Sequence, residues 1–375
     1  MPITLNGDTG IQTPMYNGTI TANAVTPSVN MKNRIINGAM VIDQRNAGAS
    51  VTPTANAYTL DRWSTQMSQA SKFSVQQNAG SVTPPVGFSN YLGVTSTSAY
   101  SVGSGDYFNI FQAIEGFNTA DLQWGTANAK TITLSFWVRS SLTGTFGGSI
   151  LNSAQSRSYP FTYTINSANT WEFETITIAG DTTGTWIGAT NGIGLYVFFG
   201  LGNGSTFSGT AGAWAGSTFL SATGATSVVG TNGATFYITG VQLEVGSTAT
   251  SFDYRPYGTE LALCQRYYYR LNSSDTSTIF ANSLNDSTTV ANGFISFEVP
   301  MRTNPTALEQ SGTASHYRVQ ITGNVINCSA VPSFNSASTF GSSVLFTVAS
   351  GLTAGQASLY RSNNTAAYLA WSAEL

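Results

Sequence analysis

Residues 131–139 read TITLSFWVR, and this alternation of apolar with other side chains is typical of a β-strand that has one face in a hydrophobic core. The opposite face of the strand combines small hydroxyl residues with one aromatic and one basic residue. The core face would carry Ile132, Leu134, Phe136 and Val138, and the opposite face Thr131, Thr133, Ser135, Trp137 and Arg139.

Other stretches of the chain show the same period. A second alternation places Leu195, Val197 and Phe199 on one face of a strand. Within residues 171–178 the alternation changes phase near Glu174, which predicts a β-bulge. Short strands separated by turn residues, with little helical periodicity, predict an all-β fold built as an antiparallel β-sandwich.

One segment has a helical period instead. Leu261, Cys264 and Tyr268 follow one another at i, i+3 and i+7, and Thr259 is a candidate N-cap. Pro256, just before this segment, interrupts any strand. We therefore expect a short helix here and a domain boundary near residue 258.

These patterns divide the chain into three parts. Residues 1–32 have short stretches between Gly and Pro, which indicate either an attachment leader that orders on a partner or a disordered terminus. Residues 33–257 would form the first β domain, and residues 258–375 the short helix and a smaller C-terminal β domain. In the latter, the expected strand faces are Ile295 with Phe297 and Val299, and Tyr317 with Val319 and Ile321.

The composition limits the function classes. Charged residues make up 8% of the chain, the net charge is -3, and Lys and Arg nowhere cluster, so we expect no nucleic-acid partner. The first residues lack a basic n-region and an apolar h-region, and no apolar run is long enough for a membrane span. We therefore expect neither a signal peptide nor membrane insertion.

Catalysis is difficult to build from these residues. The single histidine, His316, would lie on the polar face of a strand beside Arg318 and Gln320, as an exposed imidazole. Glu172 and Glu174, two positions apart on one strand, would be spaced about 6.6–7 Å along it. Two carboxylates at such a separation can hydrolyse a glycosidic bond. We interpret this pair instead as solvated residues of one sheet face, because the sequence shows nothing nearby that would raise the pKa of either.

No cofactor is expected from the sequence. Cys264 and Cys328 lack the spacing of a zinc site and are expected to be reduced and buried. One alternative stays open, a structural Ca²⁺ ion held by a few scattered carboxylates together with backbone carbonyls. The carboxylates considered are Asp61, Asp106, Glu115, Glu244 and Asp253.

Aromatic residues are the stronger indication of function, because flat rings stack on the C–H faces of sugars. Three tryptophans lie in expected loops, where rings more often serve binding, although each could instead close one end of the sandwich. These carbohydrate-binding candidates are Trp124, Trp186 and Trp214, with Tyr317 and Tyr360 in the C-terminal domain as second choices. The remaining tryptophans, Trp63, Trp137, Trp171 and Trp371, are expected in core or inter-domain packing.

Several strings between residues 33 and 270 together resemble tail-fibre and receptor-binding proteins of tailed bacteriophages and prophages. These strings are NRIINGAM (33–40), YTLDRW (58–63), QAIEG (112–116), TLSFWV (133–138), FYITGVQLEVG (236–246), FDYRPY (252–257) and LCQRYY (263–268). The resemblance implies a central jelly roll similar to carbohydrate-binding modules, and it carries over no catalytic residue. It also implies buried polar or ion-pairing positions at Asp61, Arg62, Gln242 and Arg255.

The resemblance implies a non-catalytic adhesin on the virion surface, a tail fibre or another appendage, that is made in the cytoplasm of a bacterial host. Residues 1–32 would attach it to a tail or head protein, and the chain would act as a homotrimer that binds bacterial surface polysaccharide with avidity. Two alternatives stay open. One is a structural head fibre or capsid decoration protein without glycan binding, and the other is a capsule-degrading endoglycosidase.

Overall fold

The computed structural model describes residues 31–375. The chain divides into two units, Met1–Lys32 and Asn33–Leu375, and the fold described here is that of the second. The leader predicted over residues 1–32 lies outside the described residues, apart from its last two positions. None of the helices among the described residues is long and apolar enough to cross a membrane.

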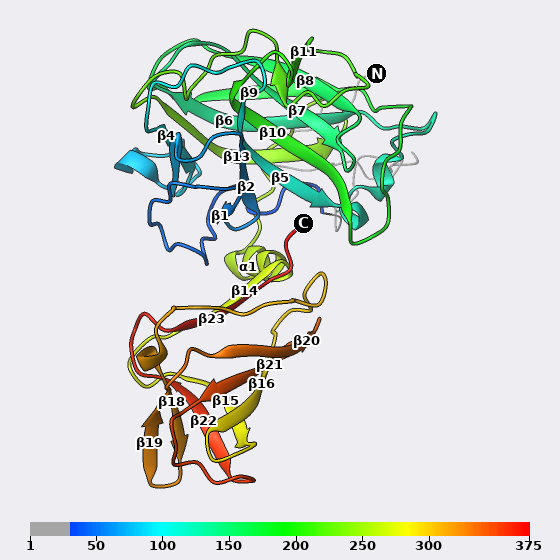
Figure 1. Ribbon diagram of the computed structural model, residues 1–375. Helices are drawn as coiled ribbons and strands as arrows, with labels where there is room; N and C mark the ends of the chain where they lie inside the picture. Colours follow the sequence, from blue (N-terminus) through cyan, green and yellow to red (C-terminus); the bar gives the residue numbers. More distant parts are fainter. Residues whose placement is uncertain (1–30) are drawn as a thin grey trace, which may run out of the picture. The chain divides into compact units, whose positions relative to one another are not determined.

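The chain up to residue 245 forms two antiparallel sheets (Figure 1). The six-stranded sheet has the order β1 (Tyr58–Leu60), β2 (Trp63–Met67), β5 (Tyr107–Glu115), β10 (Ile193–Asn203), β7 (Gly144–Asn152) and β8 (Ser158–Ile165). The five-stranded sheet has the order β3 (Phe73–Gln77), β4 (Leu92–Ser96), β13 (Thr235–Val245), β6 (Ile132–Ser140) and β9 (Glu172–Ile178). Two short parallel strands, β11 (Ser208–Gly209) and β12 (Ser221–Ala222), form a separate ribbon.

The two large sheets enclose one aromatic core, because rings from both sheets meet between them. Phe136 of β6 lies edge-on to Phe199 of β10, with 5.0 Å between ring centroids, and Phe146 of β7 stacks on Phe236 of β13 at 6.0 Å. Neighbouring strands in each sheet are mostly distant in sequence, as crossover connections require. The predicted all-β, antiparallel jelly-roll sandwich is confirmed.

The face of β6 predicted to be core is confirmed, since its four apolar side chains are fully buried. The opposite face is partly covered as well. Thr133 and Ser135 are buried, and the Thr133 hydroxyl donates to the Gly246 carbonyl at 2.9 Å. The segment after β13 therefore crosses this outer face, and Trp137 and Arg139 stay half-exposed beyond it.

The β-bulge predicted near Glu174 is wrong. Strand β9 pairs with β6 without a register shift, from Glu172 opposite Val138 to Ile178 opposite Ile132. The phase change in the sequence arises because Phe173 lies on the outer face of the sheet, where its ring packs against Trp137 with centroids 5.3 Å apart.

The predicted short helix is present as α1 (Tyr257–Gln265). Its N-cap is Pro256 rather than Thr259, because the extended backbone at Pro256 turns directly into the helix. Cys264 is buried as expected. Tyr268 is not helical, since it begins strand β14.

The strands after α1 form two further sheets around their own hydrophobic core. The three-stranded sheet has the order β14 (Tyr268–Asn272), β23 (Tyr368–Ser372) and β17 (Glu309–Gln310). The seven-stranded sheet has the order β19 (Asn324–Asn327), β18 (Tyr317–Ile321), β22 (Ala357–Ser362), β15 (Ile279–Asn285), β16 (Val290–Ser296), β21 (Gly341–Thr347) and β20 (Ser333–Ser338). Ile295, Phe297, Tyr317 and Val319 are buried in this core, as their alternation predicts. Val299 and Ile321, predicted on the same faces, are only half-buried.

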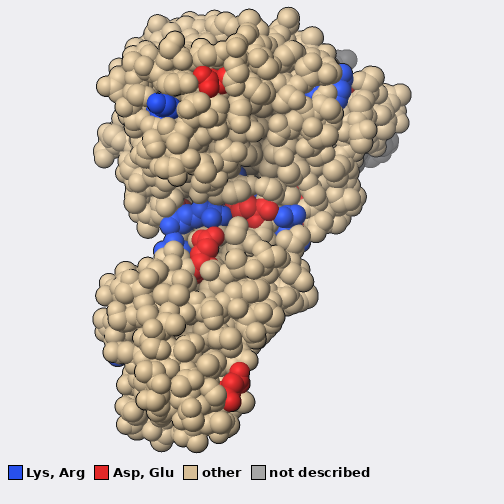
Figure 2. Space-filling view, viewed as in Figure 1, with Lys and Arg blue, Asp and Glu red and all other residues tan. Residues whose placement is uncertain are grey.

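Many of the few charged residues gather in one band, which Figure 2 shows between large uncharged surfaces. Arg62 and Glu374 form a buried ion pair, and Arg45 reaches the same carboxylate at 3.1 Å. Arg266 forms a two-point pair with Glu115 at 2.6 and 2.9 Å. These charged residues thus serve as structural ion pairs.

The four buried polar or ion-pairing positions implied by the resemblance are confirmed. Asp61, Arg62 and Gln242 are fully buried. Arg255 pairs with Glu260 at 3.4 Å.

Candidate functional site

A groove of about 420 Å³ lies on the outer face of the five-stranded sheet. Its size falls within the range of about 300–1,000 Å³ that is usual for small-molecule sites. Ser135 and Trp137 of β6, Phe173 of β9 and Gly240 of β13 contribute from the strands. The loops contribute Val86, Phe88, Ala249, Thr250, Ser251, Phe252 and Tyr254.

A backbone irregularity in β13 creates one wall of the groove. The pairing of β13 with β6 shifts register between Thr239 and Gln242, and Gly240 in this shift has a φ of 60°. A Cβ atom at Gly240 would lie 2.6 Å from Cζ of Phe88. Glycine therefore allows both the left-handed backbone and the close approach of the Phe88 ring.

Two buried polar residues hold the loop after β13 against the sheet. The Gln242 side chain donates to Glu244 at 2.8 Å and accepts from the Asp253 backbone N–H at 2.8 Å. Glu244 in turn accepts from the hydroxyl and the backbone N–H of Thr250, at 2.7 and 2.9 Å. Since each of these groups has partners, the loop is fixed as a rim rather than left free.

Aromatic rings form both sides of the groove. On one side, Phe88, Phe252 and Tyr254 contact one another with centroids 4.9–5.5 Å apart. On the other side stand Trp137 and Phe173. Phe173 is 48% exposed and Tyr254 59% exposed, so both sides offer ring surface that the described part of the chain leaves uncovered.

The groove also contains two polar groups without a partner among the residues described, the indole N–H of Trp137 and the hydroxyl of Ser135. Trp371 also lacks an acceptor, but it is fully buried in the C-terminal core. The other tryptophans all donate their N–H to a backbone carbonyl: Trp63, Trp124, Trp171, Trp186 and Trp214.

The Ser135 hydroxyl is available from the groove. Ser135 is only 2% exposed as a residue, yet it lines the groove, so the groove is the side from which its hydroxyl can find a partner. The Ser135 Oγ is not one of the buried side-chain atoms that lack a partner, so it is open to the groove. A ligand or solvent in the groove would satisfy it.

The outer face of the six-stranded sheet is partly covered by the chain itself. Leu151, Phe198 and Leu220 are almost fully buried there, with Phe207 packed against them. The segment that carries β11 and β12 supplies Phe207 and Leu220. Tyr107, Phe111 and Tyr196 on this face stay half-exposed, so it keeps some aromatic surface as well.

The structure brings the three predicted loop tryptophans together. Trp124, Trp186 and Trp214 pack edge-to-face, with centroid separations of 4.7–5.4 Å, and Tyr159 adds a fourth ring against Trp214. Trp124 is 7% exposed, whereas Trp186 and Trp214 are half-buried. All three indole N–H groups already have backbone acceptors, so the cluster is built as packing. Stacking of sugars on it stays a prediction.

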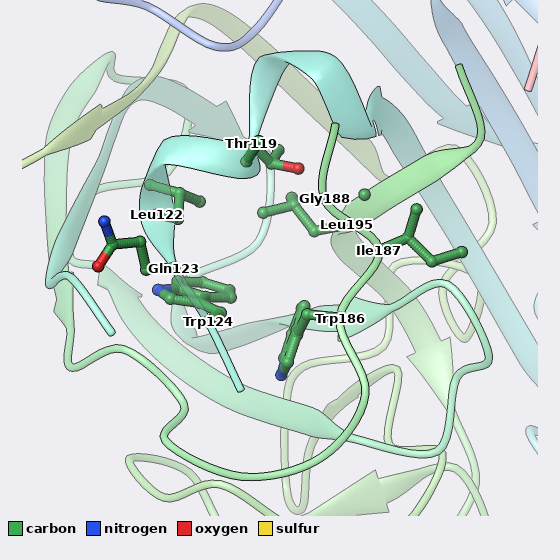
Figure 3. A pocket seen from close by; sticks show the side chains of 10 residues that line it. Thr119, Leu122, Gln123, Trp124, Trp186, Ile187, Gly188 and Leu195 are labelled. Carbon is green, nitrogen blue, oxygen red and sulfur yellow. The ribbon is translucent and has the colours of Figure 1, made fainter. Parts of the chain in front are cut away.

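A small cavity lies beside two of these tryptophans (Figure 3). Trp124 and Trp186 line it together with Thr119, Leu122 and Leu195. Its volume is about 40 Å³, and one water molecule needs about 10–15 Å³ of such space. The cavity therefore has room for a few water molecules and is too small for a sugar ring.

The two candidates that lie in the strands after α1 are corrected by the structure. Tyr317 and Tyr360 are completely buried, and their hydroxyls donate to the carbonyls of Tyr368 and Ala291 at 2.7 and 2.8 Å. The Tyr360 ring also stacks on Phe346 at 3.8 Å. Neither tyrosine has a free face for a ligand, because strands from the middle of the sheet turn these side chains into the core.

None of the residues weighed for catalysis and rejected lines the groove. His316 ends a 3₁₀ turn, not a strand, and it is half-exposed, with its Nδ1 2.9 Å from the Ser311 hydroxyl. Although burial acts in the opposite direction, hydrogen bonds from Asn166 and Ser167 lower the pKa of Glu172. Burial, with the charge of Glu172, raises the pKa of Glu174, which corrects our expectation that nothing nearby would do so.

The carboxylates considered for Ca²⁺ are engaged by the protein itself. Within residues 31–375, no group of three or more His, Cys, Asp or Glu side chains could hold a metal ion. The five carboxylates considered therefore do not gather into one such group. Each of the five accepts a hydrogen bond from a protein group: Asp61, Asp106, Glu115, Glu244 and Asp253.

Sequence reasoning missed the groove because the strand pattern concerns only the side formed by strands, and not the side formed by loops. Trp137 was expected in packing, and its half-exposed position corrects this. The signal was present, since the alternation leaves Trp137 on the face outside the core. Phe88, Phe252 and Tyr254 carry no comparable signal, because loop contacts alone bring them into the same groove.

Neither a protein-family model nor a curated protein matches the chain. Several similar solved structures have names that refer to sugars. A putative sugar-binding protein from Bacteroides thetaiotaomicron has 12% identity and a TM-score of 0.31, covering 57% of this chain and 100% of that chain. A family 11 carbohydrate-binding module from Clostridium thermocellum, in complex with a mixed-linked tetrasaccharide, has 12% identity and a TM-score of 0.28. The match covers 50% of this chain and 91% of that chain. A xylan-binding domain from Paenibacillus barcinonensis has 9% identity and a TM-score of 0.25, and the match covers 54% of this chain and 99% of that chain.

Proposed function

We propose that this protein binds carbohydrate, without cleaving it, in the groove on the five-stranded sheet. One observation carries the proposal: aromatic rings on both sides of the groove flank an indole N–H and a hydroxyl that have no partner among the described residues. Rings contact the C–H faces of sugars, while single polar groups fix the orientation of the ligand.

The groove favours binding over hydrolysis. Glycoside hydrolysis requires a pair of carboxylates across the scissile bond, and no carboxylate lines the groove within the described chain. Glu172 and Glu174 project from the opposite side of β9 to Phe173, because neighbouring residues on a strand alternate between faces. A ligand in the groove would therefore not reach them.

We further propose that the protein serves as a receptor-binding fibre or similar appendage on a bacteriophage virion, acting as a homotrimer. Support comes from the ordered strings between residues 33 and 270 that resemble such fibres. One open groove binds a glycan weakly, so several copies on one particle would supply the affinity that attachment requires. In this proposal residues 1–32 hold the chain on the virion, and bacterial surface polysaccharide is the ligand.

Affinity electrophoresis in gels that contain host polysaccharide tests the binding proposal. Trp137→Ala should weaken binding about 30-fold, which corresponds to about 2 kcal/mol for an aromatic hot spot. Phe340→Ala is the matched control, since Phe340 is 65% exposed and lies in the C-terminal domain. Equal retardation of both variants and the wild type would contradict the assignment of the groove.

The same preparation separates the two competing functions. Release of reducing ends from the polysaccharide would identify an endoglycosidase. Absence of retardation on every host polysaccharide, together with binding to virus particles, would identify a decoration protein.

A further inference from the structure

We propose that the groove selects uncharged sugar residues and rejects uronic acids, sialic acids and phosphorylated sugars. This inference rests on the proposed function and adds the chemical class of the ligand. It follows from the charges around the groove and from the two polar groups inside it that have no partner among residues 31–375.

The described residues that line the groove carry no side chain that is charged at neutral pH. An anionic sugar entering between the rings would lose part of its hydration and find no cation there. Transfer of an unpaired carboxylate out of water is strongly unfavourable. A neutral sugar loses far less, because its hydroxyls exchange water for a few protein hydrogen bonds.

A buried charge behind the rim strengthens this discrimination. Glu244 is 3% exposed, and it accepts hydrogen bonds from Gln242 and Thr250. As an acidic residue, Glu244 offers no counter-charge to an anionic sugar.

Arg139 follows Trp137 by two positions on the same face of β6, but it is engaged elsewhere. Its Nε donates to the Asn169 carbonyl at 3.0 Å, and its guanidinium carbon lies 5.6 Å from the ring centroid of Tyr237. Arg139 is thus held beyond Trp137 on the side away from Ser135, and it does not line the groove.

The free polar groups match a neutral sugar. The Ser135 hydroxyl can donate and accept, and the Trp137 indole can only donate. Two positions along a strand separate their backbones by about 7 Å, so they would contact different atoms of one sugar or of two adjacent sugars. Hydroxyl and acetamido oxygens supply the acceptors, and the aromatic walls cover the C–H faces.

An array of immobilised oligosaccharides tests this selectivity with the full chain. Neutral probes are β-glucan, galactan and N-acetylglucosamine oligomers, and acidic probes are polygalacturonate, alginate and sialyllactose. We expect binding to at least one neutral probe, with less than a twofold change between low and high salt. Trp137→Phe, which keeps a ring but removes the N–H, and Ser135→Ala should each weaken this binding about fivefold, whereas Arg139→Gln should not change it.

The outcomes distinguish carbohydrate binding in the groove from selectivity for neutral sugars. Binding to acidic probes that weakens with salt and with Arg139→Gln would overturn the neutral selectivity and leave carbohydrate binding standing. Binding to none of the probes or host polysaccharides would overturn both. If Trp137→Ala instead changed the oligomeric state in sedimentation and no glycan bound, the groove would be an interface between copies, which also overturns the proposal.

Discussion

Gly240→Ala should damage both stability and binding, because the side chain at this position must share space with Phe88. The new Cβ would stand 2.6 Å from Cζ of Phe88 at a φ of 60°. The left-handed backbone costs a non-glycine residue about 1–2 kcal/mol. Displacing Phe88 from Phe252 and Tyr254 costs about 0.5–1.5 kcal/mol for each ring pair.

The unfolded state offsets part of this loss, since alanine restricts the unfolded chain and returns about 0.4–1 kcal/mol. We therefore expect the free energy of unfolding to fall by about 2 kcal/mol, measured by urea denaturation. Carbohydrate retardation should be lost in the same variant, because Phe88 forms one wall of the groove.

Gly233→Ala is the matched control for this experiment. Gly233 also has a positive φ, of 75°, but a Cβ there would meet no atom within 4 Å. In this variant the free energy of unfolding should fall only by the backbone cost, about 1–2 kcal/mol before the unfolded-state offset. Carbohydrate binding should equal that of the wild type. If the two variants lost equal stability and both bound normally, the placement of Phe88 by Gly240 would be refuted.

Three other predictions concern the charged band and the tryptophan cluster. Glu374→Ala leaves Arg62 without its buried carboxylate, so the free energy of unfolding should fall by about 3–5 kcal/mol in urea; a loss under about 1 kcal/mol would show that the ion pair is dispensable. Burial raises the pKa of Asp61 to about 7, so its contribution to stability is fully present below about pH 4 and is lost as the pH rises through about 7. If the free energy of unfolding of Asp61→Asn depended on pH in the same way as that of the wild type, this assignment would be contradicted. Trp214→Ala should lower stability by about 2–3 kcal/mol, since it removes three ring contacts and one hydrogen bond, without weakening glycan binding. If Trp214→Ala kept its stability but lost glycan binding, the carbohydrate-binding site would be the tryptophan cluster instead of the groove.

The sequence predicted the strands well where one face is core and the other is open. Ile132, Leu134, Phe136 and Val138 are buried as their alternation requires. The same rule failed at β9, where Phe173 reads as core. Alternation identifies which residues share a face but does not show what covers that face, and Phe173 lies against another outward ring.

The candidate site was less predictable than the fold. Loop location indicated Trp124, Trp186 and Trp214, but contacts between distant loops turned them toward one another and satisfied their N–H groups. The groove depends on Phe88 meeting Phe252, which are far apart in the sequence. Such contacts are set by tertiary packing, so no local pattern could reveal them.

A structure of the protein with a bound neutral oligosaccharide tests the central claim most directly. The account predicts a sugar ring between the Trp137 and Phe88 sides of the groove, with the Ser135 hydroxyl and the Trp137 N–H within hydrogen-bond distance of its oxygens. A sugar bound at the tryptophan cluster or on the C-terminal domain, with the groove empty, would contradict it.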